Sequence, residues 1–112
     1  MAGSREDAAL IVELAKWGAM IGLAEAARDL FSDDFDPDSA DALDPHIQTV
    51  LTFSETIGTL VKNGLLDRDL VLDWLWVSGM WDRVSKAALE ARAKAGEPEL
   101  WANFEALAAE QR

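Results

Sequence analysis

The sequence contains no cysteine and only one histidine, His46, and both shortages exclude kinds of site. Without cysteine the chain has no disulfide, thiolate metal ligand or cysteine nucleophile, and nothing indicates an oxidising compartment. A single imidazole cannot build a multi-histidine zinc site, a di-iron bundle with two Glu-x-x-His pairs or more than one corner of a catalytic triad. We therefore expect no metal and no cofactor, we treat an enzyme as the minority interpretation, and we expect His46 to be an exposed first-turn helix residue.

Long apolar runs are also missing. The longest, Trp17 to Ala24, is far shorter than the ~20 residues that a membrane-spanning helix requires. The first residues show no basic segment followed by an apolar stretch and a cleavage site, which is the pattern of a secretory signal. We expect a cytoplasmic protein without membrane association.

Basic residues are scarce, with 10 Lys and Arg against 21 Asp and Glu, so the net charge is −11. Such a charge repels phosphate backbones, and we expect no direct nucleic-acid binding. It favours solubility in the first place, and it is compatible with a basic protein partner. One alternative function is therefore an acidic inhibitor or DNA mimic that occupies a basic site on another protein.

The residues that are present predict a folded, all-α protein. Half of the 112 residues are apolar, five of them tryptophan, which is too much for a disordered chain and enough for one domain spanning residues 1–112. No segment shows the two-residue alternation of a half-buried strand. We expect a compact array or bundle of about five helices in which the first is long.

The first helix is predicted to begin at Ser4, which forms a capping box with Asp7, and to run to about Phe31. Apolar residues fall on nearly all of its faces, so it requires burial on more than one side. Residues 32–44 then form an acidic loop. Its Asp34, Asp36 and Asp38 have the alternate spacing of calcium ligands, but an EF-hand loop would need glycine and glutamate where this chain has Ser39 and Pro45. A solvated connector is the preferred interpretation.

Four further helices follow in the predicted order. One is capped by Asp44, has Pro45 at its first position and ends at Asn63-Gly64, with a clear apolar half. A short helix capped by Asp67 is predicted to break near Ser78-Gly79. The next carries Trp81, Val84, Ala88 and Ala91 to Gly96, and the last begins near Pro98 and buries Leu100, Trp101, Phe104, Leu107 and Ala108.

The wide apolar perimeter of the first helix predicts an interface, because exposed patches of that size usually bind another protein. Gly18 and Gly22 are four residues apart and would allow another backbone to approach closely, within the chain or across a dimer. We expect a non-enzymatic interaction module that self-associates. The candidate interface residues are Trp17, Gly18, Ile21, Gly22 and Trp76, of which Trp76 is expected to be exposed because it is two residues from Trp74.

A second alternative function is a small-molecule sensor with a tryptophan-lined pocket. Trp74 and Trp81 belong to the densest aromatic cluster, and Glu55 follows Phe53 at the edge of an apolar helix face. Core packing is nevertheless the commoner use of Trp74 and Trp81. By helical angle Glu55 lies on the polar side with Thr59, which favours a solvated or hydrogen-bonded carboxylate.

The stretch from Val50 to Trp74, then Trp81 and the segment from Leu100 to Ala108, together resemble a family of small helical bacterial proteins, domain of unknown function 4760. The resembling positions are Phe53, Glu55, Gly58, Gly64, Leu65, Leu66, Trp81, Phe104 and Glu105. The resemblance implies a helical fold. It supplies no activity and no catalytic residue.

Overall fold

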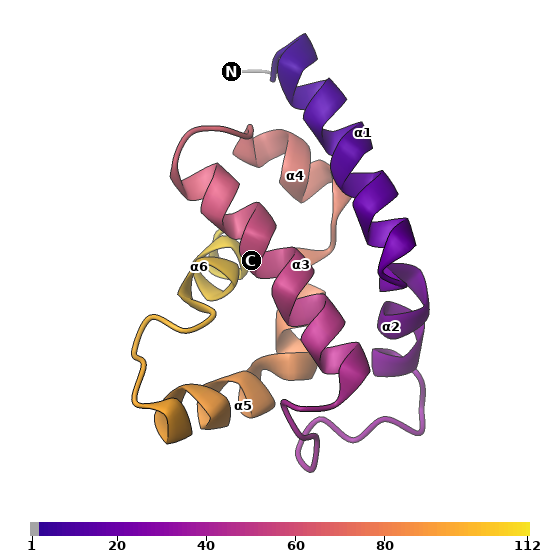
Figure 1. Ribbon diagram of the computed structural model, residues 1–112, viewed down its shortest axis with the longest axis vertical. Helices are drawn as coiled ribbons and strands as arrows, with labels where there is room; N and C mark the ends of the chain where they lie inside the picture. Colours follow the sequence, from indigo (N-terminus) through magenta and orange to yellow (C-terminus); the bar gives the residue numbers. More distant parts are fainter. Residues whose placement is uncertain (1–2) are drawn as a thin grey trace.

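The computed structural model describes residues 3–112, and all regular structure in that range is helical (Figure 1). The helices are α1 (Arg5–Met20), α2 (Leu23–Leu30), α3 (Pro45–Lys62), α4 (Arg68–Trp74), α5 (Val77–Ala95) and α6 (Ala102–Gln111). The all-α prediction is confirmed, and the expected count of about five is close to the six found in the described residues. Within those residues, no helix has the length and apolar character needed to cross a membrane.

Helix α3 is the centre of the array. It crosses the middle of the molecule in Figure 1, and it packs against α2 and α6, while α5 packs mainly against α6. The buried residues of α3 all lie on the half predicted to be apolar: Ile47, Val50, Leu51, Phe53, Ser54, Ile57 and Gly58. Burying a large apolar side chain, such as Ile47 or Phe53, stabilises the fold by about 1.5–3 kcal/mol. Helix α3 therefore contributes a large part of the core.

Helix α1 contributes far less to this core. It runs along the outside of the array in Figure 1 and buries only Leu14 and Gly18. Val12 and Met20 are exposed, although both are apolar. The prediction that this segment is buried on more than one side is therefore wrong.

Three helix starts predicted from capping residues are confirmed. Ser4 and Asp7 form the capping box of α1, and Asp44 and Asp67 accept hydrogen bonds from the first turns of α3 and α4. Asp7 also accepts from the backbone N–H of Asp67 at 2.9 Å, which ties the start of α1 to the start of α4. The bonds from Ser4, and then that from Asp67, hold the pKa of Asp7 below its ordinary value.

The long first helix of the prediction is two helices. The break lies at Ile21-Gly22, because Gly22 has φ +79°, a left-handed conformation that ends α1 and that side chains other than glycine rarely adopt. The amide N–H of Gly22 bonds the carbonyl of Ala19, which closes the last turn. The apolar pattern continues across the break, so periodicity alone did not reveal it.

The predicted break at Ser78-Gly79 is also wrong. The chain leaves helical geometry at Leu75, which has φ −118° and ψ 140°, and α5 begins at Val77. Gly79 lies in the first turn of α5. The indole of Trp76 occupies the space that a β-carbon at Gly79 would require. Packing, and not helix termination, thus accounts for this glycine.

The last helix begins later than predicted. Leu100 and Trp101 precede α6, and Trp101 has φ +62° at the N-cap position without a capping side chain. The cap comes instead from α3: Glu55 Oε1 accepts a hydrogen bond from the backbone N–H of Phe104 at 2.9 Å. The start of α6 is therefore determined by a residue of another helix.

The acidic loop of residues 32–44 is attached to α5 by two basic side chains. Arg83 Nη2 donates to the carbonyl of Phe35 at 3.4 Å, and Lys86 Nζ donates to the carbonyl of Asp38 at 2.8 Å. Asp36 is exposed, and its carboxylate accepts hydrogen bonds from the N–H of Asp38 and the hydroxyl of Ser39. Such aspartate bonds are typical of turns and agree with a connector.

Candidate functional site

The five predicted interface residues have different surroundings. Trp17 is half-buried and lies 5.3 Å from the ring of Phe53, centroid to centroid. Gly18 is buried, and a β-carbon there would lie 3.1 Å from that same ring, so its small size serves a contact within the chain.

Ile21 packs against the core, and Gly22 is the helix break with open space beside it. Gly18 and Gly22 therefore do not form one continuous helix face for a second backbone. Trp76 alone of the five is largely exposed, at 65%.

The three predicted pocket residues have different surroundings. Glu55 is the cap of α6, as a hydrogen-bonded carboxylate. Trp81 is buried, with its ring 5.1 Å from that of Phe104 in an edge-to-face contact. Trp74 packs edge-on against Phe53 and lines an apolar cavity whose lining includes neither Trp81 nor Glu55. Neither of the two cavities described below is lined by both Trp74 and Trp81.

The structure instead forms an apolar groove, which encloses about 400 Å³ between α1, α2, α3 and the segment from α4 to α5. None of its lining residues is charged: Ala15, Gly18, Ala19, Leu23, Ala24, Ala27, Phe31, Phe53, Trp74, Leu75, Trp76 and Met80. Phe31 and Trp76 stack at its edge with ring centroids 5.3 Å apart and planes 10° from parallel, and both rings are exposed. An exposed stacked aromatic pair beside an uncharged hollow is typical of a protein-binding surface.

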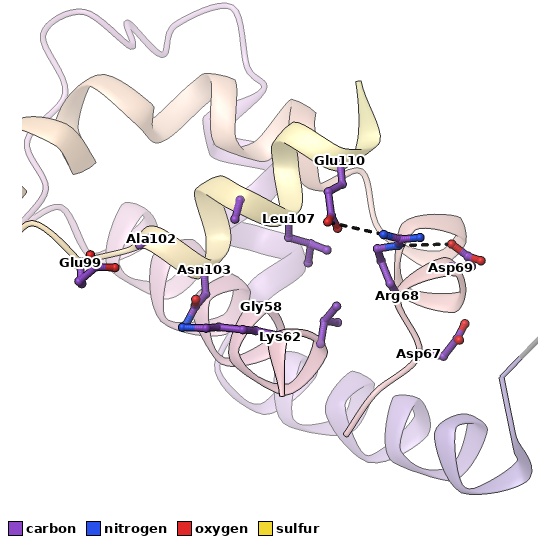
Figure 2. Close-up of a pocket in the computed structure, with 12 residues that line it drawn as sticks. Gly58, Lys62, Asp67, Arg68, Asp69, Glu99, Ala102, Asn103, Leu107 and Glu110 are labelled. Atoms are coloured by element: carbon purple, nitrogen blue, oxygen red, sulfur yellow. Dashed lines mark ion pairs between the residues drawn. The ribbon is translucent and has the colours of Figure 1, made fainter. Parts of the chain in front are cut away.

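A second cavity, the α3–α6 groove, has a mixed lining and a volume of about 720 Å³. Figure 2 shows it between α3 and α6, with the start of α4 at one end. Its lining residues are Gly58, Val61, Lys62, Asp67, Arg68, Asp69, Glu99, Ala102, Asn103, Ala106, Leu107 and Glu110. It shares no residue with the apolar groove.

Arg68 is the best-paired charge of the α3–α6 groove. Its guanidinium lies 3.6 Å from Asp69 and 3.6 Å from Glu110, and all three side chains are about half exposed or more. Exposed pairs at such distances contribute little to stability, about 0–1 kcal/mol. The groove therefore keeps side chains that can exchange these partners for those of a ligand.

His46 belongs to a small polar cluster at the start of α3. Its Nδ1 lies 2.7 Å from Asp29 Oδ2, and Asp44 caps the same turn through the N–H groups of His46 and Ile47. The hydrogen bond with Asp29 and the charges of Asp29, Asp44 and Glu25 raise the pKa of His46 above its ordinary 6.5, and partial desolvation opposes them.

The cluster at His46 also has one possible ligand atom from each of Asp29, Asp44 and His46 within 4.8 Å of one another. The ion pair and the cap already employ these groups, however. They join the end of α2 to the start of α3 and so close the two ends of the acidic loop. This structural role accounts for the cluster.

Sequence reasoning missed most of the apolar groove. Phe31, Met80 and Leu75 were assigned to no site, because the groove is built by segments that are distant in sequence. The one signal available was the exposed position of Trp76, two residues after Trp74 on the predicted helical spacing.

Comparison with known proteins agrees with the resemblance drawn from the sequence. A family model described as Domain of unknown function (DUF4760) matches residues 2–111, nearly the whole chain. No curated protein and no solved structure matches the chain.

Several resembling positions of that family lie together at the junction of α3 and α6. Glu55 bonds Phe104, and Gly58 lies where a β-carbon would come within 2.7 Å of the Asn103 carbonyl. Glu105 pairs with Arg92 at 3.0 Å. These positions therefore contribute to the packing of α6 against α3 and, through Glu105 and Arg92, against α5.

Proposed function

We propose that this chain, which belongs to the DUF4760 family of unknown function, is a non-enzymatic interaction module that forms a dimer through its apolar groove. The observation that carries the proposal is the absence of charge from the lining of that groove, together with the exposed Trp76–Phe31 pair at its edge. The partner is a second copy of the chain, for three reasons.

The first reason is electrostatic. Two copies with a net charge of −11 each repel one another, and burying like charges against each other adds a large cost. Contact through a surface without charged residues avoids that cost. The apolar groove is such a surface on a chain of which 28% is charged.

The second reason is shape. The stacked rings of Phe31 and Trp76 stand beside the groove that they help to line. A two-fold interface must be self-complementary, so that a group on one copy enters the hollow of the other and the reverse. A projecting aromatic pair next to an apolar hollow meets this condition.

The third reason is area. A stable interface buries about 800 Å² on each partner, which is roughly an eighth of the 6657 Å² accessible surface of this chain. The groove alone is small for this, but α1 continues it with the exposed Ala8, Val12, Ala15 and Ala19. Helix α1 also runs along the outside of the array (Figure 1) and buries only Leu14 and Gly18.

The test is multi-angle light scattering during size-exclusion chromatography at tens of micromolar protein. We expect a dimer for the parent chain, a helical monomer for Trp76→Glu, and a dimer for the control Leu65→Glu. Trp76 and Leu65 are matched, because each is 65% exposed and only Trp76 lines the groove. Trp17→Glu is unsuitable, since Trp17 packs on Phe53 in the core.

Two results would contradict the proposal. One is a monomeric parent chain, and the other is a dimer that Leu65→Glu disrupts as much as Trp76→Glu. If Trp76→Glu loses its helical circular dichroism, Ala24→Glu replaces it, because Ala24 is an exposed groove residue and its substitution leaves the aromatic stack in place.

A further inference from the structure

The lining of the α3–α6 groove has features that suit the binding of a third helix. Between its charged residues the groove is lined by small or aliphatic residues, Val61, Ala102, Ala106 and Leu107. Along α6, the positions from Ala102 to Glu110 span about 12 Å, or a little more than two helical turns. Small residues let another helix approach to the usual 8–10 Å between axes.

The charges of this groove favour a basic occupant. Four carboxylates line it, those of Asp67, Asp69, Glu99 and Glu110, against the cations Lys62 and Arg68, so the lining has a net charge of −2. The excess lies on a chain of net charge −11, which attracts cations and repels anions at longer range.

The acidic groups stand at the two ends of the groove and the apolar floor lies between them. Figure 2 shows Glu99 at one end of α6, and Glu110, Asp69 and Asp67 around Arg68 at the other. Lys62 extends beside Asn103 across the middle. A ligand that matches this pattern has an apolar centre with cationic side chains on both sides of it.

We propose that the α3–α6 groove binds a short amphipathic helix of a partner protein, with an apolar face on Val61, Ala102 and Ala106 and with Lys or Arg side chains at Glu99 and Glu110. Helices commonly bind in grooves of this kind through apolar residues three and four positions apart. The groove and the proposed dimer surface share no residue, so either proposal can fail without the other.

The probe for the test is a synthetic, fluorescein-labelled helix of leucine, alanine and lysine with one apolar face, and the readout is fluorescence anisotropy with the full chain. Ala106→Arg places a charge on the groove floor, and the matched control Ala109→Arg places the same charge on the same helix outside the groove; both positions are exposed. We expect Ala106→Arg to weaken binding by about tenfold and Ala109→Arg to change it little.

A second pair of variants tests the charges. Glu99→Gln with Glu110→Gln removes two groove carboxylates, while Glu90→Gln with Glu97→Gln removes two exposed carboxylates elsewhere, so the net charge changes equally. We expect several-fold weaker binding for the first pair alone. Any one of four results would overturn the proposal. The parent chain fails to bind the probe, or it binds equally well a probe with glutamate in place of lysine. Alternatively, the two glutamine pairs have equal effects, or the two arginine variants do.

Discussion

At the scale of single residues, the His46–Asp29 pair gives the chain a defined response to pH. Because the pKa of His46 is raised in the folded state, the pair stabilises the fold fully below the ordinary pKa of 6.5. That contribution disappears as the pH rises through the raised pKa, because neutral imidazole loses its charge attraction to Asp29. We expect the stability difference between the parent chain and Asp29→Asn to be larger at pH 5.5 than at pH 8, as measured by urea unfolding.

The same pair can be observed directly, since His46 is the only histidine. An NMR titration of its ring protons should give a pKa above 6.5 in the parent chain and a lower one in Asp29→Asn. Asp33→Asn is the control, because Asp33 is exposed and the carboxylate bonded to His46 is that of Asp29. Equal pKa values in the parent chain and Asp29→Asn would show that Asp29 does not hold the imidazolium.

Residue roles were predictable from the sequence where both partners are close in the chain. Ser4, Asp44 and Asp67 cap the helices that directly follow them, so the local pattern contains all the information. Glu55 caps α6 through the backbone N–H of Phe104, 49 residues further along the chain, and His46 pairs with Asp29 across the acidic loop. No local pattern contains those partners, and both roles came only from the structure.

At the scale of elements, Gly22 decides that α1 and α2 are separate helices. Its φ of +79° costs a residue with a β-carbon about 1–2 kcal/mol, although nothing lies within 4 Å of the place where that carbon would be. We expect Gly22→Ala to lower the free energy of unfolding by about 1 kcal/mol in urea titrations. Gly22→Asn should cost less, because asparagine adopts this conformation more readily.

The reverse result would be equally informative. If Gly22→Ala stabilises the chain, the segment from Arg5 to Leu30 is able to form one continuous helix, and the bend that brings α2 beside the apolar groove is not required. Gly22 and Gly79 have opposite roles. Gly22 ends a helix inside an unbroken apolar pattern. Gly79 lies within α5, where glycine is needed because Trp76 occupies the position of a β-carbon.

At the scale of the whole molecule, the fold class followed from composition and periodicity, and the surfaces did not. Helical spacing, caps and the absence of alternating segments predict an all-α chain without any knowledge of how the helices meet. The apolar groove combines Gly18, Phe31, Phe53 and Trp76 from four separate segments. Which apolar faces remain uncovered depends on the packing of all helices together, and the sequence predicted only the exposure of Trp76.

The net charge of −11 makes a prediction for the proposed dimer as a whole. If two such chains associate through an uncharged surface, long-range repulsion opposes the dimer, and added salt screens it, because the Debye length falls from about 30 Å at 0.01 M to about 3 Å at 1 M. Sedimentation equilibrium in increasing sodium chloride should therefore show the dimer dissociation constant falling by about tenfold over this range. Glu90→Gln with Glu97→Gln lowers the charge from −11 to −9 and should make the dependence shallower. An association that salt weakens would mean that ion pairs hold the two chains together, and the uncharged groove would then not be the surface through which they meet.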